Sequence, residues 1–260
     1  MRPAVALKAV KVAIPVLVLK TAVAFAGLEF MSLNPLVGSI VAGTIFVMGF
    51  VLAGVISDYK EAERMPGEIR SALDRIWTEA RLLYTTNRSF DIEAVRKRLL
   101  KIVESFLDGV ERSSGFANLK PCIESVDDLT TVISDMEKAG APPALVSRVK
   151  EGRENLLRNV LRIYYIQRTV YLPSARFLAE FLMVGVITLL LFVESGLQIE
   201  SFLQFGIITY LIIYLRFLTY ALDTPFRQGE RTQDDISLFL LKEYENKLAG
   251  ERPEVPVLSV

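Results

Sequence analysis

Residues 30–57 read FMSLNPLVGSIVAGTIFVMGFVLAGVIS, and none of these 28 residues is an Asp, Glu, Lys or Arg. A helix needs roughly 20 predominantly apolar residues to cross a bilayer core of about 30 Å. The stretch is long enough for this, and Pro35 suits the first turn of a helix. It therefore predicts a membrane-spanning helix over residues 35–57.

Three other segments are similarly apolar: residues 12–27, interrupted by Lys20, residues 177–193, and residues 202–222, interrupted by Arg216. Together with residues 35–57 they predict four transmembrane helices. A cleaved signal peptide is the alternative for the first segment. A second long span follows it at once, and no small-x-small cleavage site comes after it, so a retained helix is the better interpretation.

The basic residues predict how the chain crosses the membrane. Residues 28–34 and 194–201, which join the paired spans, contain no Lys or Arg. By the positive-inside rule both turns face outward, and both termini and the middle of the chain face the cytoplasm. The predicted organisation is spans one and two in residues 1–57, a cytoplasmic domain in 58–172, spans three and four in 173–225, and a cytoplasmic helix and tail in 226–260. The chain is predicted to be an integral protein of the cell membrane.

The cytoplasmic domain is predicted to be helical and is too charged to insert, with 19 basic and 18 acidic side chains in residues 58–172. Apolar residues recur at about 3.6-residue spacing and predict a helix over residues 59–84, with a break or kink allowed at Pro66. Ser89 is the predicted N-cap of the next helix. Ser125 is predicted to open a third helix, which stops at Gly140. The fold class is thus an all-α membrane protein with a large helical cytoplasmic domain.

Composition excludes several kinds of site. The chain has no histidine, which removes His-based catalytic triads and His-ligated metals, and one cysteine, Cys122, which removes an intramolecular disulfide and multi-cysteine metal sites. Thirty Lys and Arg balance thirty Asp and Glu, so charge gives no reason to expect nucleic acid. Carboxylate pairs such as Glu61/Glu63 and Asp127/Asp128 fit solvated helix faces. We therefore expect no enzyme, no catalytic residue, no metal site and no cofactor.

The span at residues 35–57 is unusually rich in small residues, which allow close helix contact. They are Gly38, Ser39, Ala42, Gly43, Gly49, Ala53 and Gly54. One interpretation is that they pack the spans of a single subunit. The other gives weight to Ala42, Phe46 and Phe50, which share one helix face and could line a narrow constriction where several copies surround an axis. An apolar constriction gates by dewetting, and phenyl edges tolerate a partly dehydrated anion.

Two motifs resemble the bestrophins. Phe46-Val-Met-Gly-Phe50, followed by Val55-Ile-Ser-Asp-Tyr59 and Met65-Pro66, is similar to the bestrophin neck helix and its cytoplasmic continuation. Leu222-Asp-Thr-Pro-Phe226 resembles the Asp/Asn-Pro-Phe motif after their fourth membrane helix. The order of spans and helical insertion matches as well.

The resemblance implies a homopentameric channel in the lipid bilayer that passes small inorganic anions such as chloride. Ala42, Phe46 and Phe50 would be its pore neck, wider at Ala42, where a larger residue is commoner. Animal members bind calcium soon after Pro-Phe. Here Asp234 and Asp235 lie in a run that also contains two arginines, whereas calcium needs six or more oxygen ligands, so we expect no calcium activation.

Two charged residues lie within the spans and are candidates for function because charge is costly in hydrocarbon. Lys20 is a candidate vestibule cation that attracts anions; it could instead pair with Glu29 or Glu180, or lie in a re-entrant, water-exposed helix. Arg216 lies near the cytoplasmic end of its span, where it can snorkel or pair with Asp223 or Glu180.

Two functions compete with the anion channel. A membrane-anchored helical scaffold or sensor would use the cytoplasmic helices as a partner surface and have no pore. A cation-conducting bestrophin-like channel is the other alternative. The sequence leaves open the permeant ion, the gating stimulus, the number of subunits and the role of the C-terminal tail.

Overall fold

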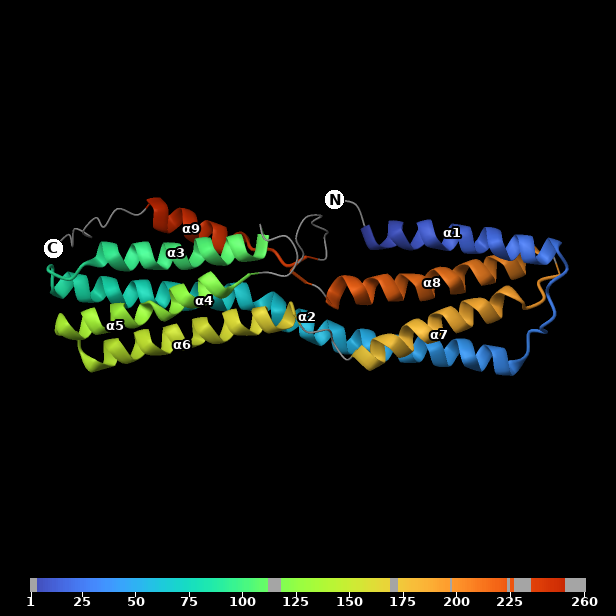
Figure 1. The fold of residues 1–260 in the computed structure, drawn as a ribbon, viewed down its shortest axis with the longest axis horizontal. Coiled ribbons are helices and arrows are strands. Elements are labelled where there is room, and N and C mark those ends of the chain that lie inside the picture. The colour runs from blue at the N-terminus through green and yellow to red at the C-terminus, as the bar shows by residue number, and fades with distance from the viewer. Residues whose placement is uncertain are drawn as a thin grey trace, which may run out of the picture. The chain divides into compact units, whose positions relative to one another are not determined.

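The structure is a computed structural model that describes residues 4–111, 118–168, 173–196, 198–223, 225–226 and 235–250. These residues form helices in the order α1 (Ala4–Phe25), α2 (Pro35–Thr86), α3 (Ile92–Glu111), α4 (Lys120–Asp127), α5 (Leu129–Lys138), α6 (Pro143–Ile166), α7 (Pro173–Leu191), α8 (Ile199–Asp223) and α9 (Phe239–Gly250) (Figure 1). Their only β feature is one isolated bridge between Met31 and Val193. The predicted all-helical class is confirmed.

The chain divides into two compact units. The first, here called the apolar unit, comprises residues 1–60, 170–225 and 232–235. The second, the charged unit, comprises residues 61–169, 226–231 and 236–260. Helix α2 contributes its first half to the apolar unit and its second half to the charged unit.

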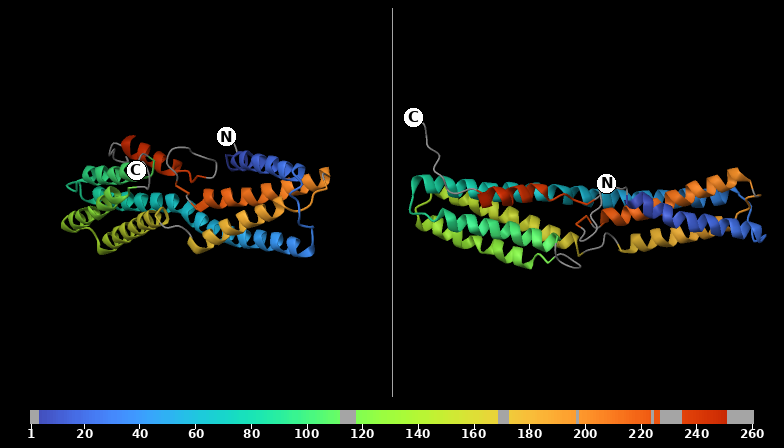
Figure 2. Two further views of the ribbon diagram at one scale, coloured as in Figure 1. Left: turned by 45° about the vertical axis from the view of Figure 1, so that its right-hand side comes forward. Right: turned by 90° about the horizontal axis from the view of Figure 1, so that it is seen from above.

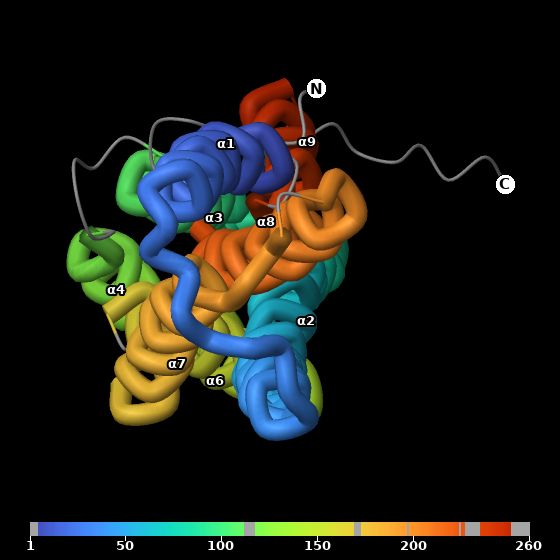
Figure 3. The backbone as a smooth tube through the Cα atoms, turned by 90° about the vertical axis from the view of Figure 1, so that its right-hand side faces the viewer, coloured from blue at the N-terminus to red at the C-terminus, as the bar shows by residue number. Residues whose placement is uncertain are grey.

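In the apolar unit, α8 lies between α1 on one side and α7 with the first half of α2 on the other (Figure 3). The helices α2, α7 and α8 are each long and apolar enough to cross a membrane. Helix α1 falls short of that criterion because every 18-residue window within it contains Lys8, Lys11 and Lys20. The fourth span therefore stays a prediction.

The two loops predicted as outward turns lie side by side. The backbone N–H groups of Phe30 and Met31 donate to the carbonyl oxygen of Phe192 at 3.2 and 3.0 Å. The N–H of Glu194 donates to the carbonyl oxygen of Met31 at 2.7 Å. The Phe30 and Phe192 rings lie 5.1 Å apart between centroids. The first hairpin is thereby joined to the second.

The charged unit has one continuous apolar core. In it α3 packs against α4 and α9, and α6 packs against α4 and α5 (Figure 2). Cys122 is fully buried in this core, and burial raises the pKa of its thiol to about 12 against a weaker opposing hydrogen bond from Ser105. Phe226, from the Pro-Phe motif, belongs to the same core.

Two helix starts differ from the predicted ones, and the break allowed at Pro66 does not occur. Helix α2 runs through Pro66 without a break, because losing one backbone hydrogen bond is offset by burial of neighbouring side chains such as Met65 and Ile69. The cap of α3 is Asp91 rather than Ser89, since the Asp91 carboxylate accepts from the N–H of Ala94 at 2.9 Å.

The third predicted helix is two short ones. Ser125 lies inside α4, where its hydroxyl donates to the carbonyl of Pro121 at 2.8 Å instead of capping a start. The predicted stop at Gly140 is confirmed. Helix α5 ends two residues earlier, and Gly140 adopts a φ of 76°, which glycine reaches without strain.

Helix α6 lies close against α2 at Gly152. A Cβ there would lie 2.9 Å from Cγ1 of Ile76 and 3.5 Å from the carbonyl oxygen of Ala72. Gly152→Val should therefore lower the free energy of unfolding by about 1–3 kcal/mol, the usual cost of overpacking. Chemical denaturation in detergent measures it. The same change at Gly67 of α2, whose Cβ would meet only a Leu240 methyl at 3.9 Å, is the control and should cost little.

A bidentate ion pair also joins α2 to α6. Arg162 Nε and Nη2 donate to the Glu61 carboxylate at 3.0 and 2.8 Å. These hydrogen bonds outweigh partial burial and lower the pKa of Glu61 below 4.5. The stabilisation is then fully present above the ordinary glutamate pKa and is lost as pH falls through the lowered value. Both side chains are partly exposed, so we expect less than about 1 kcal/mol.

Melting temperatures of the wild type and of Glu61→Gln, measured between pH 7 and pH 3, test this contribution. The two proteins should differ at pH 7 and converge in acid. A constant difference across the range would contradict the assignment.

Candidate functional site

The first half of α2 has one buried face and one exposed face. Val37, Thr44, Met48, Val51 and Val55 are buried against the rest of the apolar unit, at spacings of seven, four, three and four residues. This is the spacing of a single helix stripe. The stripe fixes which face of α2 is turned toward the other helices of the apolar unit.

The opposite face carries the predicted neck residues. Ala42 is exposed, and the side chains of Phe46 and Phe50 are 75% and 71% exposed. Small residues accompany them on the surface: a Cβ added at Gly43 or Gly49 would meet nothing within 4 Å. The interpretation that the small residues pack the spans of a single chain does not fit these glycines, because no helix among the described residues reaches them.

Lys20 is buried within the chain, at 2% exposure. Its ammonium lies 2.6 Å from Oε1 of Glu29 and donates to the carbonyl oxygens of Leu191 at 3.1 Å and Val193 at 2.5 Å. The Phe205 ring centroid lies 5.8 Å from Nζ. Of the three alternatives for Lys20, pairing with Glu29 agrees with this geometry. The free vestibule cation does not, because three acceptors surround the ammonium.

Glu29 links Lys20 to the loop that follows α7. Its carboxylate accepts from the backbone N–H of Ser195 at 3.0 Å and from the Ser195 hydroxyl at 2.7 Å, besides the ammonium of Lys20. A buried charge pair of this kind is stable only when further hydrogen bonds satisfy both groups. Lys20, Glu29 and Ser195 therefore form one structural unit, here called the loop cluster.

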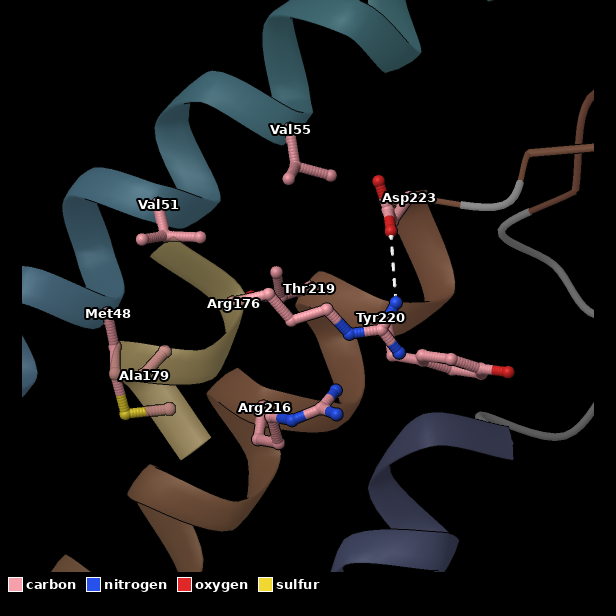
Figure 4. Close-up of a pocket in the computed structure, with 9 residues that line it drawn as sticks. All are labelled: Met48, Val51, Val55, Arg176, Ala179, Arg216, Thr219, Tyr220 and Asp223. Carbon is pink, nitrogen blue, oxygen red and sulfur yellow. Dashed lines mark ion pairs between the residues drawn. The ribbon is translucent and has the colours of Figure 1, made fainter. Parts of the chain in front are cut away.

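Arg216 is paired as well, with Glu180 of α7, one of its two expected partners. Sequence reasoning missed Arg176, which lies 3.6 Å from Glu180. It also lies 3.6 Å from Asp223 (Figure 4). The signal was present, because Arg176 and Glu180 are four residues apart on one helix. Both guanidinium groups also approach the Tyr220 ring, at 5.1 and 5.7 Å from its centroid.

Beside this network lies a small cavity, lined on its apolar side by Met48, Val51 and Val55 of α2 (Figure 4). Its volume of about 20 Å³ accommodates about one water molecule. The two arginines are balanced by Glu180 and Asp223, so the network carries no excess charge to attract a ligand. Its geometry fits a role in holding α7 to α8.

The predicted residues thus fall into three separate places: the exposed face of α2, the loop cluster, and the arginine network. Among the residues the structure describes, no group of three or more His, Cys, Asp and Glu side chains is arranged to hold a metal ion. Asp234 lies outside the described residues, so the expectation about calcium stays a prediction.

Comparison with known proteins shows which solved structures share this fold. Neither a protein-family model nor a curated protein sequence matches the chain. Solved structures do match, among them bacterial bestrophin homologs from Klebsiella pneumoniae. One that carries a single substitution has a TM-score of 0.78 at 14% identity, over 94% of this chain and 100% of that one. Another has a TM-score of 0.74 at 15% identity, over 96% and 98%. The chain has the bestrophin-like fold over nearly its whole length.

Proposed function

We propose that copies of this chain assemble as a ring of five into a channel that passes small anions such as chloride. The observation that carries the proposal is the exposed face of α2. Phe46 and Phe50 are 75% and 71% exposed on a helix whose other face is buried, so a ring of copies would turn them toward its axis. Ala42 would form the wider end of that neck.

The physical chemistry of this face suits a pore more than a lipid contact. Lipid-facing helix surfaces gain nothing from glycine, whereas Gly43, Gly49 and Ala53 would let neighbouring helices approach closely around an axis. Phenyl rings there would present positive edges to a permeating anion. Being apolar, they would also impose a dehydration barrier, which makes the neck a gate as well as a filter.

The choice of five subunits and of chloride rests on the bestrophin resemblance, and the fold supports that resemblance. In the proposed topology α1, α2, α7 and α8 all cross the cell membrane, with both termini and the charged unit in the cytoplasm. Helix α1 can serve as the fourth span because Lys20, the charge deepest within it, is paired with Glu29 inside the protein. The pairing reduces the cost of placing that charge in hydrocarbon.

Recording from purified protein in planar bilayers, with a potassium chloride gradient, tests the proposal. Single-channel steps that reverse near the chloride equilibrium potential support it. Reversal near the potassium potential would favour the cation-conducting alternative, and silence with normal folding would favour the scaffold. Particle mass in detergent gives the number of copies, and a monomer would overturn the ring.

A further inference from the structure

The charged unit contains an open groove between α2 and α6 that the proposed channel does not use. Its volume is about 580 Å³. Arg64 and Arg75 line it from α2, eleven residues apart and thus on one helix face. Asn155, Arg158 and Asn159 line it from α6, at positions that share a face of that helix.

Ion pairs bound the groove at both ends. The Glu61–Arg162 pair joins α2 to α6 beyond one end, and Arg75 lies 3.3 Å from Glu151 at the other. Between these pairs Arg158 is exposed and has neither a hydrogen bond nor an ion pair with any residue the structure describes. The middle of the groove therefore holds an uncompensated guanidinium.

The polar groups that line the groove are chiefly donors. A guanidinium offers five N–H groups in a planar fork, and each asparagine amide offers two more. The amides of Asn155 and Asn159 make no hydrogen bond to another described residue. The one carboxylate in the lining, Glu68, lies 3.8 Å from Arg64 at an exposed position, where such a pair contributes little.

We propose that this groove binds a multiply charged anion of the phosphate class, such as a diphosphate. Arginine forks match phosphate oxygens in pairs of parallel hydrogen bonds, and free amides supply the remaining donors. A halide would leave most of a 580 Å³ groove empty. Such binding is independent of the proposed pore, because it requires only the charged unit.

Isothermal titration of the full-length protein in detergent with inorganic pyrophosphate tests the site. Arg158→Gln should weaken binding about tenfold, the loss of one charge-assisted interaction. Arg81→Gln is the matched control: Arg81 is also exposed, lies on α2 outside the groove, and has no partner among the described residues. It should leave the dissociation constant unchanged.

A second variant should strengthen binding, which misfolding could not do. Glu68→Gln removes the carboxylate of the groove and should tighten pyrophosphate binding about threefold. Equal affinities in Arg158→Gln and wild type, weaker binding in Glu68→Gln, or the same heat from sodium chloride at matched ionic strength would each overturn the proposal.

Discussion

Replacing Phe46 and Phe50 together by alanine is expected to raise the single-channel conductance severalfold, approaching tenfold. The two rings are the bulkiest groups on the exposed face of α2, and in the proposed ring they form the narrowest apolar part of the path. Smaller side chains would let an ion keep more of its water. Each 1.4 kcal/mol removed from the barrier raises the rate about tenfold. Planar bilayer recording at matched salt measures the change.

The control is a pair of equally exposed phenylalanines on another helix. Phe177 and Phe181 of α7 are 71% and 65% exposed, and in the proposed ring they do not face the axis. The double change Phe177→Ala with Phe181→Ala should leave the conductance close to that of the wild type. If both double variants conduct alike, Phe46 and Phe50 do not form the neck.

Lys20→Met is expected to destabilise the protein by about 3–5 kcal/mol, the cost of leaving one partner of a buried ion pair without the other. The Glu29 carboxylate would keep only its hydrogen bonds from Ser195, and the carbonyls of Leu191 and Val193 would lose their shared donor. Chemical denaturation in detergent, followed by circular dichroism, measures the loss.

A double variant tests whether the loss of stability in Lys20→Met comes from the broken ion pair with Glu29. Lys20→Met combined with Glu29→Gln removes both charges and should recover part of the stability lost in Lys20→Met alone. Lys150→Met is the control, since Lys150 makes an exposed pair with Glu137 and should cost less than about 1 kcal/mol. Additive losses at Lys20 and Glu29 would contradict the pairing.

The parts of the fold that the sequence predicted correctly are those that follow from local sequence patterns. The charge-free run at residues 30–57 predicted the membrane half of α2, and regular apolar spacing predicted its charged half. A break was allowed at Pro66 and does not occur, because a proline within a helix signals a local cost but not the burial that offsets it. Ser89 was preferred over Asp91 as the cap of α3, although both residue types are good caps and only geometry decides between them.

For the candidate site, too, the sequence predicted what depends on local spacing and missed what depends on contacts between distant segments. Helical spacing placed Ala42, Phe46 and Phe50 on one face, but whether that face is exposed depends on which side α7 and α8 cover. Glu29 was one of two possible partners named for Lys20, and the structure shows that it is the one that pairs. The carbonyls of Leu191 and Val193, and the groove between α2 and α6, depend on contacts between distant segments, which no local pattern reveals.

The loop cluster has a consequence for the order in which the protein is made. Two of the three acceptors around the Lys20 ammonium come from residues 171 and 173 positions later in the chain. A ribosome has therefore translated most of the protein before the first helix finds its full set of partners. Until then the Lys20 ammonium lacks the carbonyl oxygens of Leu191 and Val193, so α1 can reach its final packing only after α7 has been made.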